Sequence, residues 1–330
     1  MAVLVTGGLG AIGAFVTRKL VEMSAEPIVY TRHRDLLLVG DIAEKLTIVQ
    51  GDILDLDNLV RTIKGYGVDR IIHVSAMVME SETNPPMAIR VNAEGTSNIM
   101  ETALRCQISR VVYTSAKGVY NEAKGPHAHP TYKPINEDYP ADANMGFYGL
   151  TKLFGERVGF QYRQRHGIDF VALRFSSTYG PGKIVKYGAS SPLTIQSRII
   201  ENAMLGKPTR HPQGAEQKDD FVYNKDVANG IVLACFAQNL THHLFNVGSG
   251  VGSTLLDFAA ATKKVFPKVE ISIGPGLDFF NIGHNVYNVF DISRAANEIG
   301  YRPQYDLEAG IRDYAEMLRV LGIAPVDTSD

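Results

Sequence analysis

Tyr148 and Lys152 are two side chains whose types and spacing suggest catalysis. They stand four residues apart in a stretch with helical patterning, residues 147–165, so they would share one helix face. A free tyrosine has a pKa near about 10 and is a poor base, but a neighbouring lysine cation stabilises the phenolate and lowers that pKa. The pair could therefore exchange a proton with a substrate hydroxyl. Because the same spacing occurs by chance on many solvated helices, this interpretation depends on the elements around it.

A glycine-rich turn comes first in the chain. Gly7, Gly10 and Gly13 lie between an apolar run, residues 2–6, and a helical pattern, residues 12–23. Glycines allow positive φ and close approach of the backbone to a pyrophosphate, and the helix N-terminus offers free N–H groups. We interpret this turn, with Ala11 and Ile12, as the phosphate-binding part of a dinucleotide site. The alternative is a turn that closes a strand-helix unit without a ligand.

The end of the second apolar run bears on the choice of cofactor. A carboxylate here binds the ribose of NAD, whereas an arginine accommodates the extra phosphate of NADP. The run ends at Thr31 and is followed by Arg32, His33 and Arg34, without a carboxylate at that point. We therefore expect NADP to be preferred, with NAD as the alternative. In the other interpretation, these arginines belong to a solvated strand end.

Two further strand ends are expected to contact the cofactor. Asp52 and Ile53 follow the third run, where the carboxylate could bind an adenine amino group or cap a helix. Small side chains at the end of the fourth run would let a dinucleotide lie against the sheet. These residues are Val74, Ser75 and Ala76.

Strand and helix patterns alternate through the first half of the chain. The expected strands are residues 2–6, 27–31, 46–49, 70–74, 110–114 and 170–175, and the expected helices are residues 12–23, 56–63, 86–105 and 147–165. Such alternation predicts an α/β fold, a Rossmann-type doubly wound parallel sheet. We assign residues 1–180 to the NAD(P)-binding domain. Residues 181–330, punctuated by prolines, would form a smaller substrate-binding lobe with some elements returning to the first domain.

Composition limits the classes of function. The chain has 330 residues, of which 45% are apolar and 21% charged, with a net charge of -2, so nucleic acid binding is not expected. Two cysteines are too few for a disulfide framework or a cysteine zinc site. No apolar run approaches the roughly 20 residues that span a bilayer, and strand-like sequence begins at Ala2. We expect a soluble cytoplasmic protein that does not bind membranes.

The sequence resembles the extended short-chain dehydrogenase/reductases, the NAD(P)-dependent epimerase/dehydratase family, over nearly the whole chain. The matching stretches are residues 6–13, 51–53, 91–96, 148–152, 174–182 and 220–227. This resemblance implies hydride transfer at a nicotinamide, with Tyr148 as the acid/base. Lys152 would lower the pKa of that tyrosine and bind the cofactor. It also implies a homodimer through the helices around residues 92–105 and 148–165. On these motifs we add Asn92, Thr114, Phe175 and Ser177 to the cofactor site.

One family position is altered. The family has a catalytic serine or threonine four residues before a tyrosine, and counting back from Tyr120 gives Ala116. Ser115 precedes it and, by strand alternation, would face the other way. A local shift could let Ser115 supply the catalytic hydroxyl, another hydroxyl could take its place, or Ala116 could be an engineered replacement. We keep Ser115 as a catalytic candidate beside Tyr148 and Lys152.

The substrate-side motifs also depart from the family. Relatives that bind nucleotide-diphosphate sugars use an asparagine and arginines, but Ser177 and Asp219 stand in two of these positions and residues 276–290 contain no arginine. A carboxylate opposes a pyrophosphate. We therefore predict a dehydrogenase or reductase acting on a small polyol, sugar, hydroxy acid or ketone. The expected substrate contacts are Met77, Ala116, Lys117, Ser176 and Lys183.

Two other functions stay open. One is a nucleotide-sugar epimerase with tightly bound NAD, and the other is a non-catalytic dinucleotide sensor. Dehydration is disfavoured, because Lys117 and Gly118 replace the Asp-Glu pair of dehydratases. No metal is expected, since His127 and His129 lack further ligands at a convincing spacing. Their loop is instead predicted to wall the substrate pocket, together with residues 79–82 and 183–198.

Overall fold

A parallel sheet of seven strands forms the larger part of the molecule. The computed structural model describes residues 1–143, 146–283 and 286–329. The strand order is β10-β6-β5-β4-β1-β2-β3, and every neighbouring pair is parallel. The strands are β1 (Ala2–Thr6), β2 (Glu26–Thr31), β3 (Thr47–Gln50), β4 (Val68–His73), β5 (Arg110–Ala116), β6 (Phe170–Phe175) and β10 (Leu244–Val247). The predicted doubly wound α/β fold is confirmed.

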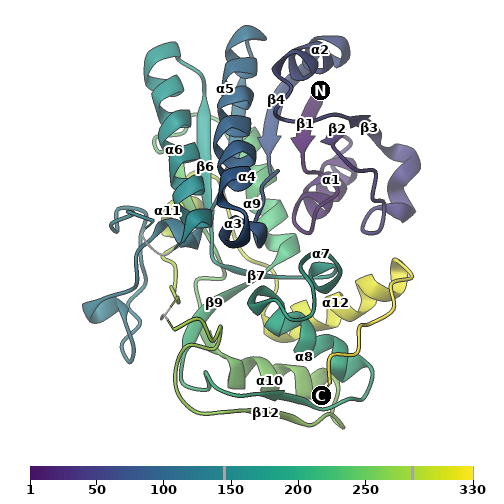
Figure 1. Cartoon of the computed structure of the whole chain (residues 1–330), viewed down its shortest axis with the longest axis vertical. Helices are drawn as coiled ribbons and strands as arrows, with labels where there is room; N and C mark the ends of the chain where they lie inside the picture. The colour runs from purple at the N-terminus through teal and green to yellow at the C-terminus, as the bar shows by residue number, and fades with distance from the viewer. Residues whose placement is uncertain (144–145, 284–285, 330) are drawn as a thin grey trace.

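Helices cover both faces of this sheet, as Figure 1 shows. Along β1, Val3 and Val5 face one hydrophobic core and Leu4 faces the other, because successive side chains of a strand point to opposite faces. One core is closed by α1 (Gly13–Glu22), α9 (Asn224–Phe236) and α11 (Ser293–Glu298). The other is closed by α2 (Leu56–Tyr66), α5 (Gly95–Arg105) and α6 (Phe147–His166).

The structure refines several expected boundaries. The helix expected at residues 86–105 is α4 (Pro85–Ala88), a π-helical turn (Ile89–Glu94) and then α5, preceded by the short α3 (Glu80–Thr83). Strand β10 was not expected. It joins the main sheet beside β6. Strand β10 and the helices α9 and α11 come from the second half of the chain but pack in the larger part of the molecule. No helix in the described ranges is long and apolar enough to cross a membrane.

A smaller lobe lies at the carboxyl ends of the main strands (Figure 1). Its strands form the sheets β11-β9-β7 and β12-β8. The elements of this second lobe are β7 (Ser177–Tyr179), β8 (Thr209–His211), β9 (Lys218–Tyr223), β11 (Gly252–Thr254), β12 (Ile271–Ile273), α7 (Lys183–Tyr187), α8 (Ile195–Met204), α10 (Leu255–Val265) and α12 (Leu307–Val320). Aromatic side chains, among them Tyr179, Phe221 and Phe258, form its core.

A buried carboxylate joins the two parts. Asp220 in β9 accepts hydrogen bonds from the hydroxyls of Ser176 and Ser249 at 3.1 and 2.7 Å. It also accepts from the backbone N–H groups of Ser249, Gly250 and Phe290 at 2.6, 3.1 and 3.3 Å. Burial raises the pKa of Asp220 to about 6, while these donors favour its charged form. The carboxylate thus holds three separate segments at the base of the second lobe.

We expect Asp220→Asn to lower the free energy of unfolding by about 1–3 kcal/mol. Either orientation of the new amide places an NH₂ group against backbone N–H donors that now bind a carboxylate oxygen. Urea unfolding would measure the change, with Asp57→Asn on the exposed first turn of α2 as the control. An Asp220→Asn protein as stable as the control would show that this carboxylate does not join the two parts.

Candidate active site

The cavity lies between the main sheet and the second lobe. It has a volume of about 590 Å³ and is lined by the carboxyl ends of β1, β4, β5 and β6. Strand order reverses between β1 and its neighbours β2 and β4, which is where open α/β sheets bind their ligands. The predicted residues that line it are Gly7, Gly10, Ala11, Ile12, Gly13, Thr31, Arg32, Asp52, Ile53, Val74, Ser75, Ala76, Met77, Thr114, Ser115, Ala116, Lys117, Tyr148, Lys152, Phe175, Ser176, Ser177 and Lys183.

The glycine turn has the backbone that a pyrophosphate requires. Gly7 has a φ of 66°, and a Cβ atom there would lie 2.9 Å from the backbone nitrogen of Ser75. A Cβ atom on Gly13 would clash with the carbonyl oxygen of Gly7. The N-terminus of α1 therefore begins directly at the cavity wall. These residues fit a dinucleotide.

A carboxylate does reach the end of β2. Asp35, three residues beyond Arg32, lines the cavity and forms an ion pair with Lys186 of α7. This corrects the sequence interpretation, which considered only the residues directly after the strand. The ion pair also joins the loop after β2 to the second lobe.

Asn92 is the one predicted cofactor residue that is absent from the lining of this cavity. It is buried, and its side chain exchanges hydrogen bonds with the backbone N–H and carbonyl of Met77 at 2.7 and 2.9 Å. It also donates to the hydroxyl of Thr151 at 3.0 Å. Asn92 therefore positions the loop of Met77 and helix α6, and its expected contact with the cofactor stays a prediction.

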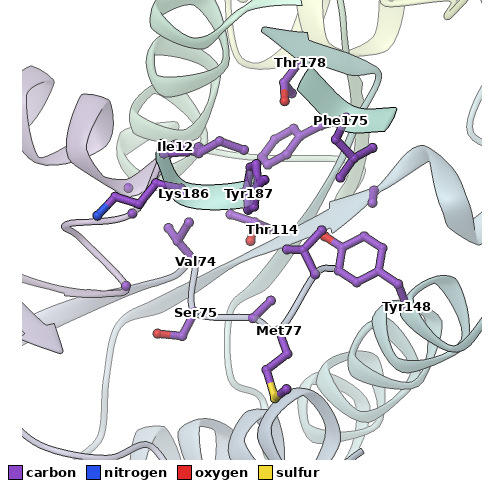
Figure 2. A pocket seen from close by; sticks show the side chains of 18 of the residues that line it. Ile12, Val74, Ser75, Met77, Thr114, Tyr148, Phe175, Thr178, Lys186 and Tyr187 are labelled. Atoms are coloured by element: carbon purple, nitrogen blue, oxygen red, sulfur yellow. The ribbon is translucent and has the colours of Figure 1, made fainter. Parts of the chain in front are cut away.

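Tyr148 and Lys152 share one wall of the cavity, as their spacing predicts. Figure 2 shows the phenolic oxygen of Tyr148 pointing toward the middle of the cavity. The ammonium of Lys152 lies 6.0 Å from the ring centre of Tyr148 and 4.5 Å from that of Tyr113. Burial lowers the pKa of Lys152 to about 7, against the opposing effect of Glu156. Burial, and to a smaller extent Tyr187, raises the pKa of Tyr148.

The hydroxyl of Ser115 is not free to act on a substrate. It donates to the carboxylate of Glu156 on α6. Arg174 holds the same carboxylate from β6 through two hydrogen bonds of 2.9 and 2.7 Å, and all three side chains are buried. The expected catalytic role of Ser115 is therefore corrected. Ala116 lines the cavity, so the family's hydroxyl is missing from its usual position.

Lys117 is neutralised within the cavity wall. Its ammonium pairs with the buried carboxylate of Asp219 and donates to the hydroxyl of Ser177 at 2.7 Å. It also lies 5.1 Å from the ring centre of Phe280. Asp219, which stands where relatives carry an arginine for the substrate, is therefore one member of an internal ion pair.

The second lobe contributes to the lining, as predicted for residues 183–198, whereas none of residues 79–82 is part of it. Thr178, Lys186, Tyr187, Pro192, Leu193, Gln196, Phe280 and Ile282 line the cavity. Of these, Thr178, Phe280 and Ile282 were not predicted, and no particular residue of 183–198 other than Lys183 was singled out. The one local signal was that Lys183 and Tyr187 stand four residues apart between Gly182 and Gly188. Nothing in that spacing says that the short helix faces the main sheet.

The loop with two histidines does not wall this cavity. Neither His127 nor His129 lines it. The ring of His127 hydrogen-bonds the carbonyl of Lys133 at 2.8 Å, and the ring of His129 contacts Tyr132 edge-on. The expectation for this loop was wrong, because its aromatic neighbours hold it elsewhere. In the described ranges no group of three metal-ligating side chains is found.

We expect Lys152→Met to stabilise the protein freed of any dinucleotide, more strongly at pH 7 than at pH 10. The pKa of Lys152 is lowered in the fold, so between about pH 7 and 10.5 the unfolded chain binds a proton that the folded chain does not. The parent's stability should therefore rise with pH across this window, by at most about 1.4 kcal/mol per pH unit from this group.

Removing the amine should flatten that rise, so the stability difference between Lys152→Met and the parent should shrink as pH increases. Chemical denaturation at several pH values would measure it, with the exposed Lys268→Met as the control. A difference that stays constant from pH 7 to 10 would contradict the lowered pKa.

Comparison with known proteins extends these findings. Residues 3–248 match the model of the NAD dependent epimerase/dehydratase family. A putative UDP-glucose 4-epimerase of Methanocaldococcus jannaschii is 30% identical over 319 residues, covering 94% of this chain and 96% of that protein.

Solved structures share the fold. The UDP-glucose 4-epimerase of Thermotoga maritima, determined with UDP-glucose, has a TM-score of 0.80 at 22% identity, over 97% of this chain and 99% of that one. The UDP-glucuronic acid 4-epimerase of Bacillus cereus, determined with UDP-glucuronic acid and NAD, has a TM-score of 0.79 at 23% identity, over 97% and 100%. At these identities the likeness concerns the fold alone.

Proposed function

The chain belongs to the NAD dependent epimerase/dehydratase family, and we propose that it is an NAD-dependent epimerase of a nucleotide-linked sugar. The observation that carries this is that Tyr148 and Lys152 line the same cavity as the glycine turn. The epimerase names of similar proteins favour this function over the dehydrogenase of small compounds that the substrate-side motifs predict.

Each part of the cofactor has a proposed place in the cavity. Gly7, Gly10 and Gly13 would hold the pyrophosphate, Asp52 the adenine, and Lys152 the ribose of the nicotinamide. The chemistry that NAD supplies in such a site is the reversible uptake of a hydride from the substrate carbon.

Tyr148 would remove the proton of the sugar hydroxyl while its carbon is oxidised, and return it when the carbon is reduced. The buried ammonium of Lys152 favours a nearby negative charge, since an isolated charge away from water is unfavourable. A phenolate at Tyr148 is such a charge. The pair would therefore stabilise the deprotonated tyrosine that the reaction requires.

We also propose that the cofactor is NAD rather than the NADP expected from Arg32. The carboxylate of Asp35, three residues after Arg32, lines the same cavity and would repel the extra phosphate of NADP. Its ion pair with Lys186 links the two parts of the molecule beside the cavity, which suits a cofactor that stays bound while a hydride leaves and returns.

The homodimer implied by the family resemblance has a candidate face. Leu150 and Phe154 on α6 are 49% and 45% exposed although they are large apolar residues. They stand four residues apart, on one side of the helix. Ile89, in the turn before α5, is 46% exposed as well. We propose that these residues pack against a second copy of the chain.

We expect Asp35→Asn to bind NADP roughly tenfold better relative to NAD than the parent does, because the variant removes a like charge and frees Lys186. Fluorescence titration with both dinucleotides would measure the ratio. Asp41→Asn in the same loop, which pairs with Arg18 outside the cavity, is the matched control. An unchanged ratio would show that Asp35 does not select the cofactor.

The catalytic proposal predicts that Tyr148→Phe lowers kcat by roughly 10²–10⁴-fold, since the variant cannot transfer the proton. Ser115→Ala, whose hydroxyl binds Glu156, should stay within a few-fold of the parent. Inversion of UDP-glucose and of UDP-glucuronic acid would be followed by NMR. A fully active Tyr148→Phe enzyme would overturn the proposed mechanism.

A second function is favoured by one observation. The pairing of Lys117 with Asp219 neutralises this cation, which fits a small uncharged substrate of a dehydrogenase better than a pyrophosphate. Denaturing the purified protein and identifying the released dinucleotide separates the two functions. Retained NAD that does not exchange during dialysis supports the epimerase, whereas readily exchanged cofactor supports the dehydrogenase.

A further inference from the structure

The cavity lacks the hydroxyl that would bind the reacting oxygen beside Tyr148. Ala116 stands in its position. Serine and threonine hydroxyls that line the cavity are already engaged. Those of Thr31 and Thr114 donate to backbone carbonyls at 3.0 and 3.1 Å, those of Ser115, Ser176 and Ser177 donate to carboxylates, and that of Thr178 accepts from Lys183 at 2.7 Å. The hydroxyl of Ser75 points away from Tyr148 in Figure 2. A donor of another kind on the walls of the cavity could take the place of the missing hydroxyl.

Helix α7 brings a second tyrosine into the cavity. The helix is only five residues long, and Gly182 and Gly188 flank it with a φ of 84° each. Lys183 and Tyr187 stand four residues apart, so they share the face that lines the cavity. Val185, on the opposite side, is 53% exposed. Figure 2 shows Tyr187 entering the space toward which the oxygen of Tyr148 points.

The arrangement repeats that of the catalytic pair. The ammonium of Lys183 lies 6.0 Å from the ring centre of Tyr187, the same distance as between Lys152 and Tyr148. Lys183 is buried and donates to the carbonyl and the hydroxyl of Thr178, the latter at 2.7 Å. These bonds hold the lysine, and with it the helix face, against the strand β7. The cavity therefore has a tyrosine–lysine pair on each of two walls.

The protonation of Tyr187 suits a donor rather than a base. Burial, and then the charge of Glu80, raises its pKa to about 12, so the phenol keeps its proton at neutral pH. Tyr187 in turn contributes to the raised pKa of Tyr148.

We propose that Tyr187 donates the hydrogen bond to the reacting substrate oxygen that the serine or threonine of relatives supplies, and that Lys183 positions it. This inference rests on the proposed function, because it concerns the oxygen on which Tyr148 acts. Tyr187 keeps its proton throughout, so it adds no further transfer to the reaction. The active site would then be complete only when the second lobe is in place.

The test is Tyr187→Phe, alone and combined with Ala116→Ser, using UDP-glucose and UDP-glucuronic acid as substrates. A hydrogen bond that strengthens as charge develops on the oxygen acts on kcat more than on KM. We expect Tyr187→Phe to lower kcat by roughly 10²–10³-fold with little change in KM. Ala116→Ser should restore much of that loss in the double variant, because it returns a hydroxyl to the family position.

Control variants distinguish a failure of the inference on Tyr187 from a failure of the proposed function. Val185→Ala, on the outer face of the same helix, should behave like the parent. If Tyr148→Phe is inactive but Tyr187→Phe is fully active, the inference on Tyr187 is wrong and the proposed function stands. If Tyr187→Phe is impaired and Ala116→Ser restores nothing, Tyr187 only shapes the cavity and the inference is also wrong. If Tyr148→Phe is fully active, the proposed function itself has failed.

Discussion

Helix α6 packs against strands β5 and β6 and the turn after β5 more closely than any side chain but glycine would allow. Cβ atoms on Gly149, Gly155 and Gly159 would clash with Gly118, Tyr113 and Phe170 respectively. This close packing brings the helix face that carries Tyr148, Lys152 and Glu156 onto the end of β5. This close packing therefore fixes the positions of Tyr148, Lys152 and Glu156.

The same helix face accounts for the electrostatics of the site. Lys152 is buried beside the ring of Tyr113, so its charge is poorly solvated and favours a phenolate at Tyr148. One turn further along, Glu156 is neutralised by Arg174 and binds the hydroxyl of Ser115. Removing one member of such a buried pair leaves an unpaired charge, which is strongly destabilising. Ser115 thus belongs to a structural network, and the reacting side of β5 is left with Ala116.

The second lobe supplies the rest of the chemistry. Asp220 holds its base to the main sheet, and the ion pair of Asp35 with Lys186 joins it to the loop after β2. Between these attachments, α7 presents Lys183 and Tyr187 to the cavity. Opposite charges within the wall, Lys117 and Asp219, neutralise each other. The lobe therefore both encloses the cofactor site and lines the space left for a substrate.

The amino-acid sequence by itself determined the nucleotide-binding part of this protein. Alternating buried strands and amphipathic helices specify a parallel sheet, and the glycine turn and the Tyr148–Lys152 spacing act over a few residues within single elements. Such short-range patterns predicted the fold and nearly all of the cavity lining in the main sheet. Strand β10 escaped notice because it is short and lies in the second half of the chain.

Only the tertiary structure decided what depends on distant contacts. The direction of the Ser115 hydroxyl follows from Glu156, 41 residues away, and the reach of Asp35 follows from its pairing with Lys186, 151 residues away. The histidine loop and Tyr187 belong to segments without regular patterning, whose orientation is set by packing against neighbours far along the chain. Local sequence patterns carry no information on those neighbours, so the proposed donor opposite Tyr148 became visible only once the chain was folded.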